Sequence, residues 1–144
     1  MIYCMKLISK KGLDASEVRQ LVREIKIQSF LDHPNIVNLY NVFADEDYIY
    51  LLLEPCLDGN LFKLIQERPL TEKETKKYVY DLSKAVDGLH KHDILHRDIK
   101  PENVLIHAGT AKLCDFGWAI YSKVLRQTNC GTPLYASPEL VGEG

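Results

Sequence analysis

The chain has 144 residues, a formal charge of −2, 46% apolar residues and 26% charged residues, which are ordinary values for one globular domain. The small net charge gives no electrostatic reason to expect nucleic acid or an anionic membrane as a partner. Its longest apolar segment, Tyr48 to Leu53, has only the length of a strand, so no membrane span is predicted. None of the four cysteines belongs to a C-x-x-C pair, so the pattern favours neither a zinc site nor a disulfide framework and indicates a reducing compartment.

The first thirty residues predict a strand and then a helix. Residues 1–8 have strand character. Asp14, with Glu17 three residues later, has the spacing of a capping box, and we expect a helix over about 15–31. Apolar and amide side chains at helical spacing predict its buried face. These residues are Val18, Leu21, Val22, Ile25 and Gln28.

Two more strands are predicted after this helix. Pro34 ends the helix, because proline lacks a backbone donor and restrains the residue before it. Residues 37–43 and 48–53 are rich in aliphatic and aromatic side chains, and the polar turn at 44–47 joins them. This spacing predicts an antiparallel hairpin.

A short helix and a long helix are expected next. The breaker sequence at 58–60 precedes a short helix that ends near Glu67. Thr71 and Glu74 form a clear capping box, which opens a helix that runs to about His90. We interpret the long helix as a scaffold without chemistry, buried along one apolar face. That face consists of Tyr78, Leu82, Ala85, Val86 and Leu89.

Two motifs follow in series. His96-Arg97-Asp98-Ile99-Lys100-Pro101-Glu102-Asn103 reads H-R-D-x-K-x-x-N, and Asp115-Phe116-Gly117 reads D-F-G. Between them, residues 104–106 and 112–114 predict a hairpin that turns at Ala108-Gly109. A protein-kinase active site needs the two motifs in this order and at about this distance, which a surface loop with scattered acids would match only by coincidence. The sequence therefore resembles a eukaryotic protein kinase, from end to end.

The resemblance implies an α+β fold that corresponds to part of a kinase domain. Residues 1–53 would be the remainder of the N-terminal lobe with its helix αC, residues 54–58 the hinge, and residues 59–144 an incomplete, mainly helical C-terminal lobe. The implied activity is the ATP-dependent transfer of the γ-phosphoryl group to a serine or threonine hydroxyl of a protein.

The catalytic roles are carried over from the kinase pattern. Asp98 would orient the substrate hydroxyl and accept its proton, and Lys100 would neutralise charge on the transferred phosphoryl group. A lysine at this place is typical of serine/threonine kinases. Asn103 and Asp115 would ligate Mg²⁺, which prefers hard oxygen ligands. Thr132 would form hydrogen bonds with Asp98 and Lys100.

The resemblance also implies an ATP site. Tyr3-Cys4-Met5-Lys6 aligns with the V-A-I-K strand of kinases, although a lysine there would by itself be read as an exposed strand residue. Glu24 is the implied partner of Lys6, and the alternative is a solvated glutamate. Leu53 would be the gatekeeper before the hinge. Leu105 would close the adenine pocket from below. The residues implied for ATP binding are Lys6, Glu24, Leu53, Glu54, Cys56, Glu102, Asn103, Leu105 and Asp115.

Regulation is implied at three residues. Thr128 aligns with the activating phosphothreonine of many serine/threonine kinases, and the alternative is an exposed threonine that is never modified. A phosphate on Thr128 would be received by Arg97 and Arg23. His96 and Phe116 are interpreted as packing residues.

Two details resemble the Aurora kinases in particular. Trp118 directly follows the D-F-G motif, and Gln28 occupies a position that is usually aliphatic. The segments 23–29, 33–36 and 115–119 also resemble that family. Polo-type and cyclic-nucleotide-dependent kinases are the other candidate families.

The Aurora resemblance implies a mitotic kinase that prefers basic residues near its target and is activated by a protein of the spindle or centromere. Its expected location is the cytoplasm and nucleus, and in mitosis the spindle and the centrosome or centromere. Pro55, Cys56 and Cys114 depart from the usual Aurora residues. Cys114 is either a reactive thiol near the phosphates or, as we favour, a buried and inert one.

Neither a glycine-rich loop nor the later helices of a kinase domain have a counterpart in the sequence. We therefore expect an internal part of a longer kinase, with little phosphotransfer and marginal stability by itself. A short, non-catalytic binding module is the alternative. A pseudokinase is disfavoured, because Lys6, Glu24, Asp98, Asn103 and Asp115 are all present.

Overall fold

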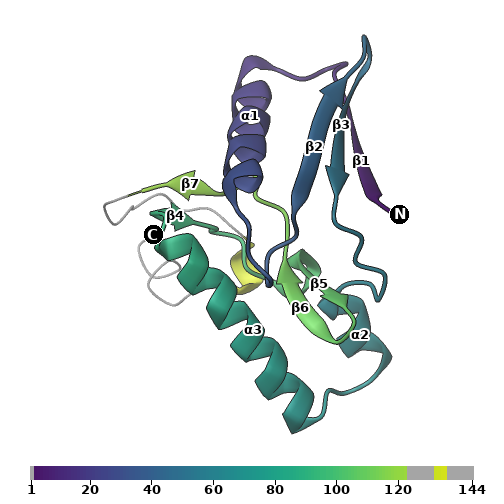
Figure 1. Ribbon diagram of the computed structural model, residues 1–144, viewed down its shortest axis with the longest axis vertical. Helices are drawn as coiled ribbons and strands as arrows, with labels where there is room; N and C mark the ends of the chain where they lie inside the picture. Colours follow the sequence, from purple (N-terminus) through teal and green to yellow (C-terminus); the bar gives the residue numbers. More distant parts are fainter. Residues whose placement is uncertain (1, 123–131, 136–144) are drawn as a thin grey trace.

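The structure is a computed structural model that describes residues 2–122 and 132–135. A three-stranded antiparallel sheet and one helix form its first part: β1 (Cys4–Ser9), α1 (Ala15–Phe30), β2 (Leu39–Ala44) and β3 (Tyr48–Leu53). The strand order is β1-β3-β2, so the edge strand β1 pairs with the second strand of the hairpin. Helix α1 stands beside this sheet (Figure 1). The predicted strands at 1–8 and 37–43 are thus present, with boundaries shifted by one to three residues.

Helices and small hairpins form the second part (Figure 1). The long helix α3 lies beside the hairpin β5–β6, and the short strands β4 and β7 pair with each other. This mixture of helices and small sheets confirms the predicted α+β class. None of the described helices is long and apolar enough to cross a membrane. The bounds are α2 Leu61–Glu67, α3 Glu72–His90, β4 Ile94–Leu95, η1 Pro101–Asn103, β5 Val104–His107, β6 Thr110–Leu113, β7 Ile120–Tyr121 and η2 Pro133–Tyr135.

Helix α1 begins at the predicted capping box. The Asp14 carboxylate accepts hydrogen bonds from the backbone N–H groups of Ser16 and Glu17, and the Glu17 side chain accepts one from the Asp14 N–H. The predicted buried face was wrong in part, because Val18 and Val22 are exposed. The buried residues instead recur at the i, i+3, i+6 and i+7 positions of a neighbouring face, which puts Glu24 on the buried side. These residues are Leu21, Glu24, Ile27 and Gln28.

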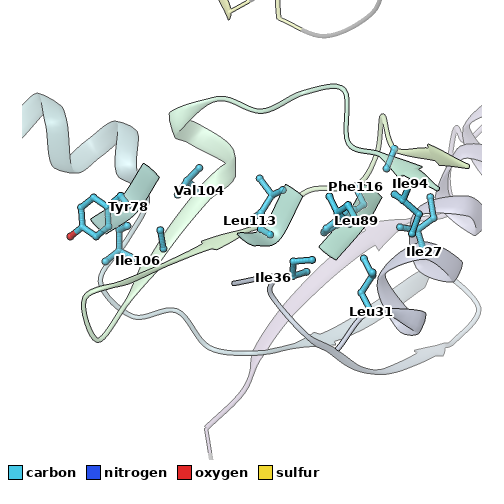
Figure 2. Packing of buried hydrophobic residues seen from close by; sticks show 13 residues of the cluster. Ile27, Leu31, Ile36, Tyr78, Leu89, Ile94, Val104, Ile106, Leu113 and Phe116 are labelled. Carbon is cyan, nitrogen blue, oxygen red and sulfur yellow. The ribbon is translucent and has the colours of Figure 1, made fainter. Parts of the chain in front are cut away.

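The core joins the two parts of the molecule. Figure 2 shows side chains of α1, α3, β5 and β6 gathered in one cluster. Ile27, Leu89, Leu113 and Phe116 have at most 1% of their surface exposed. Each such side chain contributes about 1.5–3 kcal/mol by leaving water. Phe116 is the middle residue of the D-F-G motif. Because the core holds Phe116, it also fixes the positions of its neighbours Asp115 and Gly117.

A tight turn closes the hairpin β5–β6 at the predicted residues. His107 pairs with Thr110, and both turn residues have positive φ, 48° at Ala108 and 72° at Gly109. Two positive φ angles are the mark of a type I′ turn, whose twist matches that of the strands. The Asp58 carboxylate accepts a hydrogen bond from the Ala108 N–H at 2.7 Å, which attaches this turn to the segment before α2.

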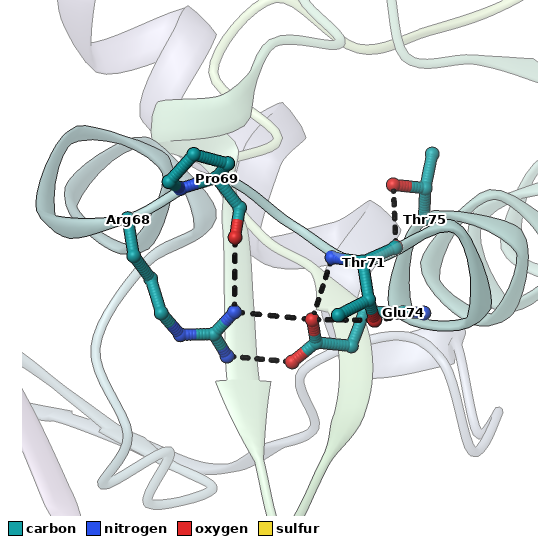
Figure 3. Close-up of polar contacts among 5 residues, drawn as sticks. All are labelled: Arg68, Pro69, Thr71, Glu74 and Thr75. Carbon is teal, nitrogen blue, oxygen red and sulfur yellow. Dashed lines mark hydrogen bonds and ion pairs between the residues drawn. The ribbon is translucent and has the colours of Figure 1, made fainter.

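The start of α3 is fixed by a network of side chains (Figure 3). The Thr71 hydroxyl accepts a hydrogen bond from the Glu74 N–H at 3.2 Å, and Glu74 Oε2 accepts one from the Thr71 N–H at 2.8 Å. Arg68 Nη1 donates to the same oxygen at 3.0 Å. The hydrogen bonds from Arg68 and then from Thr71 lower the pKa of Glu74 to about 2. The capping box therefore also ties the loop after α2 to α3.

Thr71→Ala is expected to lower the free energy of unfolding by about 0.5–2 kcal/mol, because the first turn of α3 loses its side-chain cap. Urea unfolding followed by circular dichroism measures the change. Thr71→Ser is the matched control and should retain most of the stability, since serine keeps the hydroxyl. Equal losses in both variants would contradict the assigned role of the hydroxyl.

Candidate active site

A cavity of about 310 Å³ lies where the two parts of the molecule meet, and all nine residues predicted to bind ATP line it. Residues from β1 and α1 line one side, and residues from η1, β5 and the segment after β6 line the other. Four further residues, which were not among the predicted ATP-binding residues, also line this cavity. They are Cys4, Gln28, Val37 and Cys114. Cys4 could have been found, because residues two apart on a strand face the same side and Lys6 was already placed there.

Lys6 and Glu24 form an ion pair inside this cavity, with 2.9 Å between Lys6 Nζ and Glu24 Oε1. The alternative of a solvated glutamate does not hold, since the Glu24 side chain is only 10% exposed, whereas the Lys6 side chain is 44% exposed and is held by its pairing with Glu24. Burial would lower the pKa of Lys6, but the Glu24 charge and its hydrogen bond outweigh burial and raise this pKa. Lys6 is therefore a fixed cation on the wall of the cavity.

Asp98 stands at the centre of a second network. Its Oδ1 accepts a hydrogen bond from the Thr132 hydroxyl at 2.8 Å, and its Oδ2 lies 3.0 Å from Lys100 Nζ. Lys100 Nζ also donates to the Thr132 hydroxyl at 2.7 Å. Asn103 Nδ2 donates both to Asp98 Oδ2 at 3.0 Å and to the Asp98 carbonyl at 2.9 Å. The structure thus brings together four residues that span 35 positions of the chain.

These contacts keep Asp98 ionised. Asp98 is only 7% exposed, and burial alone would raise its pKa. The hydrogen bonds from Thr132, Lys100 and Asn103 outweigh burial and hold the pKa of Asp98 below its usual value. The carboxylate therefore carries its charge at neutral pH in a fixed orientation, as a group that orients a hydroxyl requires.

Asn103 and Asp115 offer oxygen atoms to a cation at the same cavity. Both amide protons of Asn103 are directed to Asp98, which leaves its Oδ1 as a ligand atom. Asp115 Oδ1 accepts a weak hydrogen bond from the Gly117 N–H at 3.2 Å. Asp115 has a φ of 61°, an uncommon angle for a residue other than glycine and one that occurs often at functional sites.

This donor set fits Mg²⁺ held partly by a nucleotide. Mg²⁺ usually takes one or two protein oxygens and completes its shell with phosphate oxygens and water. Asn103 Oδ1 and the Asp115 carboxylate, two hard oxygen donors at the cavity, agree with that number of protein ligands. Within residues 2–122 and 132–135, no group of three or more His, Cys, Asp or Glu side chains forms a metal cage. The magnesium site predicted from the sequence is therefore compatible with the structure as a site shared with phosphate.

His96 is a packing and orienting residue. Its ring lies edge-on to the Phe116 ring, with 5.0 Å between ring centres. Its Nε2–H donates to the Cys114 carbonyl at 3.0 Å, and its Nδ1 accepts from the Asp98 N–H at 3.3 Å. The contact at Nδ1 requires a neutral ring, because a protonated Nδ1 could not accept, and burial lowers the pKa of His96 in keeping with that form. His96 thereby links the backbones of the two motifs.

The free energy of unfolding is expected to decrease as the pH falls from 7.5 to 5.5. A histidine whose folded pKa lies below the unfolded value of about 6.5 gives full stability above that pH and loses it on acidification. Burial lowers the pKa of both His96 and His33. Urea titrations at several pH values measure the effect. His96→Asn keeps an acceptor for the Asp98 N–H and should show a smaller loss, whereas an unchanged loss would contradict the role of His96.

The predicted regulatory residues are only partly described. Thr128 lies outside the described residues. Arg97 has a φ of 67°, and its Nε donates to the Trp118 carbonyl at 2.8 Å. Arg23 is exposed on α1. The structure shows no contact between the two arginines, so their joint role as a phosphate receptor stays a prediction.

Glu54 begins the predicted hinge and directs its side chain away from solvent. Its carboxylate lies 2.9 Å from Lys112 Nζ and accepts a hydrogen bond from the Asn38 N–H at 3.2 Å. The Glu54 N–H donates to the Asn38 carbonyl at 2.9 Å. Lys112 and Glu54 are 10% and 15% exposed, which makes theirs a largely buried ion pair. Since Lys112 precedes Asp115 by three residues, this pair fastens the hinge segment to the strand that leads to the D-F-G motif.

Cys114 fits the interpretation of a buried, inert thiol. It lies between Leu113 in the core and Asp115 at the cavity, and burial raises the pKa of its thiol to about 12. At neutral pH the thiol is protonated and a poor nucleophile. Its backbone N–H donates to the Asn103 carbonyl at 2.9 Å, which links the two motifs once more.

Comparison with known proteins agrees with this geometry. The protein kinase domain family matches residues 1–144. The chain is 43% identical over 143 residues to serine/threonine-protein kinase Aurora-2 of Arabidopsis thaliana, a match that covers 97% of this chain and 51% of the relative. It is 45% identical over 141 residues to Aurora/IPL1-related protein kinase 2 of Caenorhabditis briggsae, covering 95% of this chain and 47% of the relative.

A mammalian relative gives the same result. Aurora kinase B of Mus musculus is 43% identical over 144 residues, covering 97% of this chain and 42% of the relative. The chain spans about half the length of these curated relatives. These relatives are named as Aurora kinases, and the match to the protein kinase domain shows that the chain belongs to the protein kinase family.

Proposed function

We propose that the protein containing this chain transfers the γ-phosphoryl group of ATP to serine or threonine hydroxyls of protein substrates. Membership of the protein kinase family implies ATP as the donor and proteins as acceptors. The observation that carries the proposal is the Asp98 network. Thr132, Lys100 and Asn103 hold one ionised carboxylate next to a cavity that Asn103 lines and whose wall carries the Lys6–Glu24 ion pair.

Each residue of the site has a role that its geometry supports. Lys6 would neutralise phosphate oxygens of the bound nucleotide, and Glu24 keeps the ammonium group in place. Asp98 would orient the acceptor hydroxyl and take up its proton at a carboxylate oxygen. Lys100 would compensate the negative charge on the transferred group. Asn103 and Asp115 would hold Mg²⁺, which supplies further charge neutralisation when it is bound.

We further propose an Aurora-type role in mitosis, with substrates that carry basic residues near the target. The similarity to Aurora relatives supports this assignment. Activation would combine phosphorylation of Thr128 with binding of a spindle or centromere protein. The expected locations are the cytoplasm and nucleus, and in mitosis the spindle and the centrosome or centromere. Imaging of the tagged protein through mitosis tests the location, and a diffuse signal at every stage would contradict it.

Lys6→Met is expected to weaken Mg·ATP binding by about 10- to 100-fold, because a charge-assisted hydrogen bond contributes about 1.5–3 kcal/mol. Calorimetric titration of the full-length protein with Mg·ATP measures the change. Lys11→Met makes the same substitution at an exposed residue just after β1 and should leave the affinity unchanged. Equal affinities for the Lys6 variant and the parent protein would contradict the proposed nucleotide site.

A further inference from the structure

The outer edge of β6 is held by side chains and a loop. In the part of the chain that the structure describes, β5 and β6 form a sheet of two strands. The edge of a strand that faces away from its neighbour carries backbone N–H and C=O groups that the sheet leaves unpaired, and such groups are costly when they are buried. Ala111 and Leu113 of β6 both have 0% of their surface exposed. Their outward backbone groups therefore need partners from other elements.

Ala111 receives both of its partners from side chains. Its N–H donates to Asp81 Oδ2 at 3.0 Å, and its carbonyl accepts from Asn35 Nδ2 at 3.1 Å. Asp81 belongs to α3, which lies beside β6 (Figure 1), whereas Asn35 belongs to the loop between α1 and β2. One residue of β6 is thus held from both parts of the molecule.

The same loop supports β6 further towards the D-F-G motif. The Leu113 N–H donates to the Asn35 carbonyl at 2.8 Å, and the Leu113 carbonyl accepts from the Val37 N–H at 3.0 Å. The next N–H, that of Cys114, donates to the Asn103 carbonyl at 2.9 Å. The residue after Cys114 is the aspartate of the D-F-G motif. The position of β6 therefore decides where that aspartate stands.

Asp81 does not line the cavity, so any effect on the reaction must pass through β6. It is only 7% exposed, and its other partner is Lys77 Nζ at 2.9 Å, one turn earlier on α3. The Lys77 side chain is 49% exposed, and an ion pair with a solvated lysine adds little to stability. A buried carboxylate is costly without hydrogen bonds, and the buried donor that Asp81 meets is the Ala111 N–H.

We propose that Asp81 is a positioning residue for phosphoryl transfer, which fixes β6 and thereby the place of Asp115 relative to Asn103. The proposal rests on the proposed function, which assigns these two residues to Mg²⁺. Asp115 follows Ala111 by four residues, so a shift of β6 moves it directly. A displacement of about 1 Å in a reacting site can lower a rate by about 10²-fold, so a contact outside the cavity can control kcat.

The experiment compares variants of the full-length protein at Asp81 and at its exposed partner. Asp81→Leu has a similar size but no acceptor for the Ala111 N–H, and we expect kcat for a basic serine/threonine peptide to fall by about 10- to 100-fold. Asp81→Asn keeps an oxygen for this N–H and should retain most of kcat. Lys77→Met, the matched control, removes the ion pair, leaves the hydrogen bond to Ala111, and should retain most of kcat as well.

Two further readouts report on position. Hydrogen exchange of the segment 110–114, measured by mass spectrometry without nucleotide, tests the hold on β6 directly. Exchange there should become at least about tenfold faster in Asp81→Leu and stay unchanged in Asp81→Asn. The free Mg²⁺ concentration that gives half the maximal rate at saturating ATP should also rise in Asp81→Leu and not in Asp81→Asn, since the leucine variant displaces Asp115.

Other variants separate positioning from stability. Thr71→Ala weakens the start of the same helix without touching β6, so it should lower the free energy of unfolding and leave the exchange of 110–114 and the Mg²⁺ dependence unchanged. If Asp81→Leu does not fold, Asp81→Ala takes its place, because water can reach the Ala111 N–H beside the smaller side chain. Asp81→Ala should show the same changes in exchange, Mg²⁺ dependence and kcat, each smaller than in the leucine variant.

Two results would overturn the proposal. One is a full kcat in folded Asp81→Leu or Asp81→Ala, which would leave Asp81 with a purely structural role. The other is an equal loss of kcat in Asp81→Leu and Asp81→Asn, which would show that the hydrogen bond to Ala111 is not the cause. Failure of the proposed function is distinguishable, because the parent protein would then transfer no phosphate to the peptide. The exchange data would in that case still decide whether Asp81 holds β6, but its role in phosphoryl transfer would be overturned.

Discussion

Asp98→Asn is expected to lower kcat for phosphoryl transfer by about 10²- to 10⁴-fold, the usual contribution of a positioned general base. The amide oxygen can still accept the hydrogen bond from Thr132. The amide group has no negative charge, so it cannot take up the proton of the acceptor hydroxyl or pair with Lys100. The KM for ATP should change by much less, because Asp98 does not line the cavity. Transfer of labelled phosphate from ATP to a basic serine/threonine peptide by the full-length protein measures both constants.

Asp93→Asn is the matched control for this variant. Asp93 lies five residues before Asp98, is exposed, and has a φ of 57°, a region that asparagine tolerates well. The same chemical change should leave kcat unchanged there. A full kcat in Asp98→Asn, with ATP binding intact, would remove Asp98 from the reaction and contradict the proposed function.

Lys112→Met is expected to destabilise the fold by about 3–5 kcal/mol, because it leaves the largely buried Glu54 carboxylate without its cation. Thermal or urea unfolding of the purified chain measures the loss. If the parent chain is only marginally stable, the Lys112→Met variant will not fold. The unfolding experiment would then show no cooperative transition for this variant.

A double variant separates the unpaired charge from lost packing. Lys112→Met with Glu54→Gln removes both charges, while the glutamine oxygen still accepts the hydrogen bond from the Asn38 N–H. We expect its stability to lie within about 2 kcal/mol of the parent, since replacing both members of a buried pair costs far less than breaking it. Lys91→Met removes an exposed pair with Asp87 and should leave the unfolding midpoint unchanged. Equal losses in the single and double variants would contradict the role of the ion pair.

The elements that depend on local signals were predicted well. Both capping boxes, at Asp14 and at Thr71, begin helices at the expected residues. The turn at Ala108-Gly109 lies where the breaker residues placed it. Such signals involve residues within four or five positions of one another, so they can be recognised in the sequence without knowledge of the tertiary structure. Strand ends were less accurate, because hydrogen bonds to distant strands decide where a strand stops.

The burial of polar residues could not be predicted from local patterns. Glu24 on α1 and Asp81 on α3 were not placed among the buried positions, yet they are only 8% and 7% exposed. Asp81 Oδ2 accepts hydrogen bonds from the Ala111 N–H at 3.0 Å and from Lys77 Nζ at 2.9 Å. The first of these partners lies 30 residues away. A hydropathy pattern places a charged residue on the outside, and only a distant partner reverses that placement.

The sequence by itself determined the order and spacing of the motifs, and hence the family and the residues to examine, because these are properties of the chain. Only the tertiary structure decided which side chains meet. The resemblance implied the Lys6–Glu24 pair and the contacts of Thr132 with Asp98 and Lys100, and the structure shows that these side chains meet. The structure alone revealed the buried Lys112–Glu54 ion pair and the gathering of three thiols at one cavity. The physical reason is that hydrogen bonds, burial and charge pairing depend on distances in space, which core packing fixes after the local elements have formed.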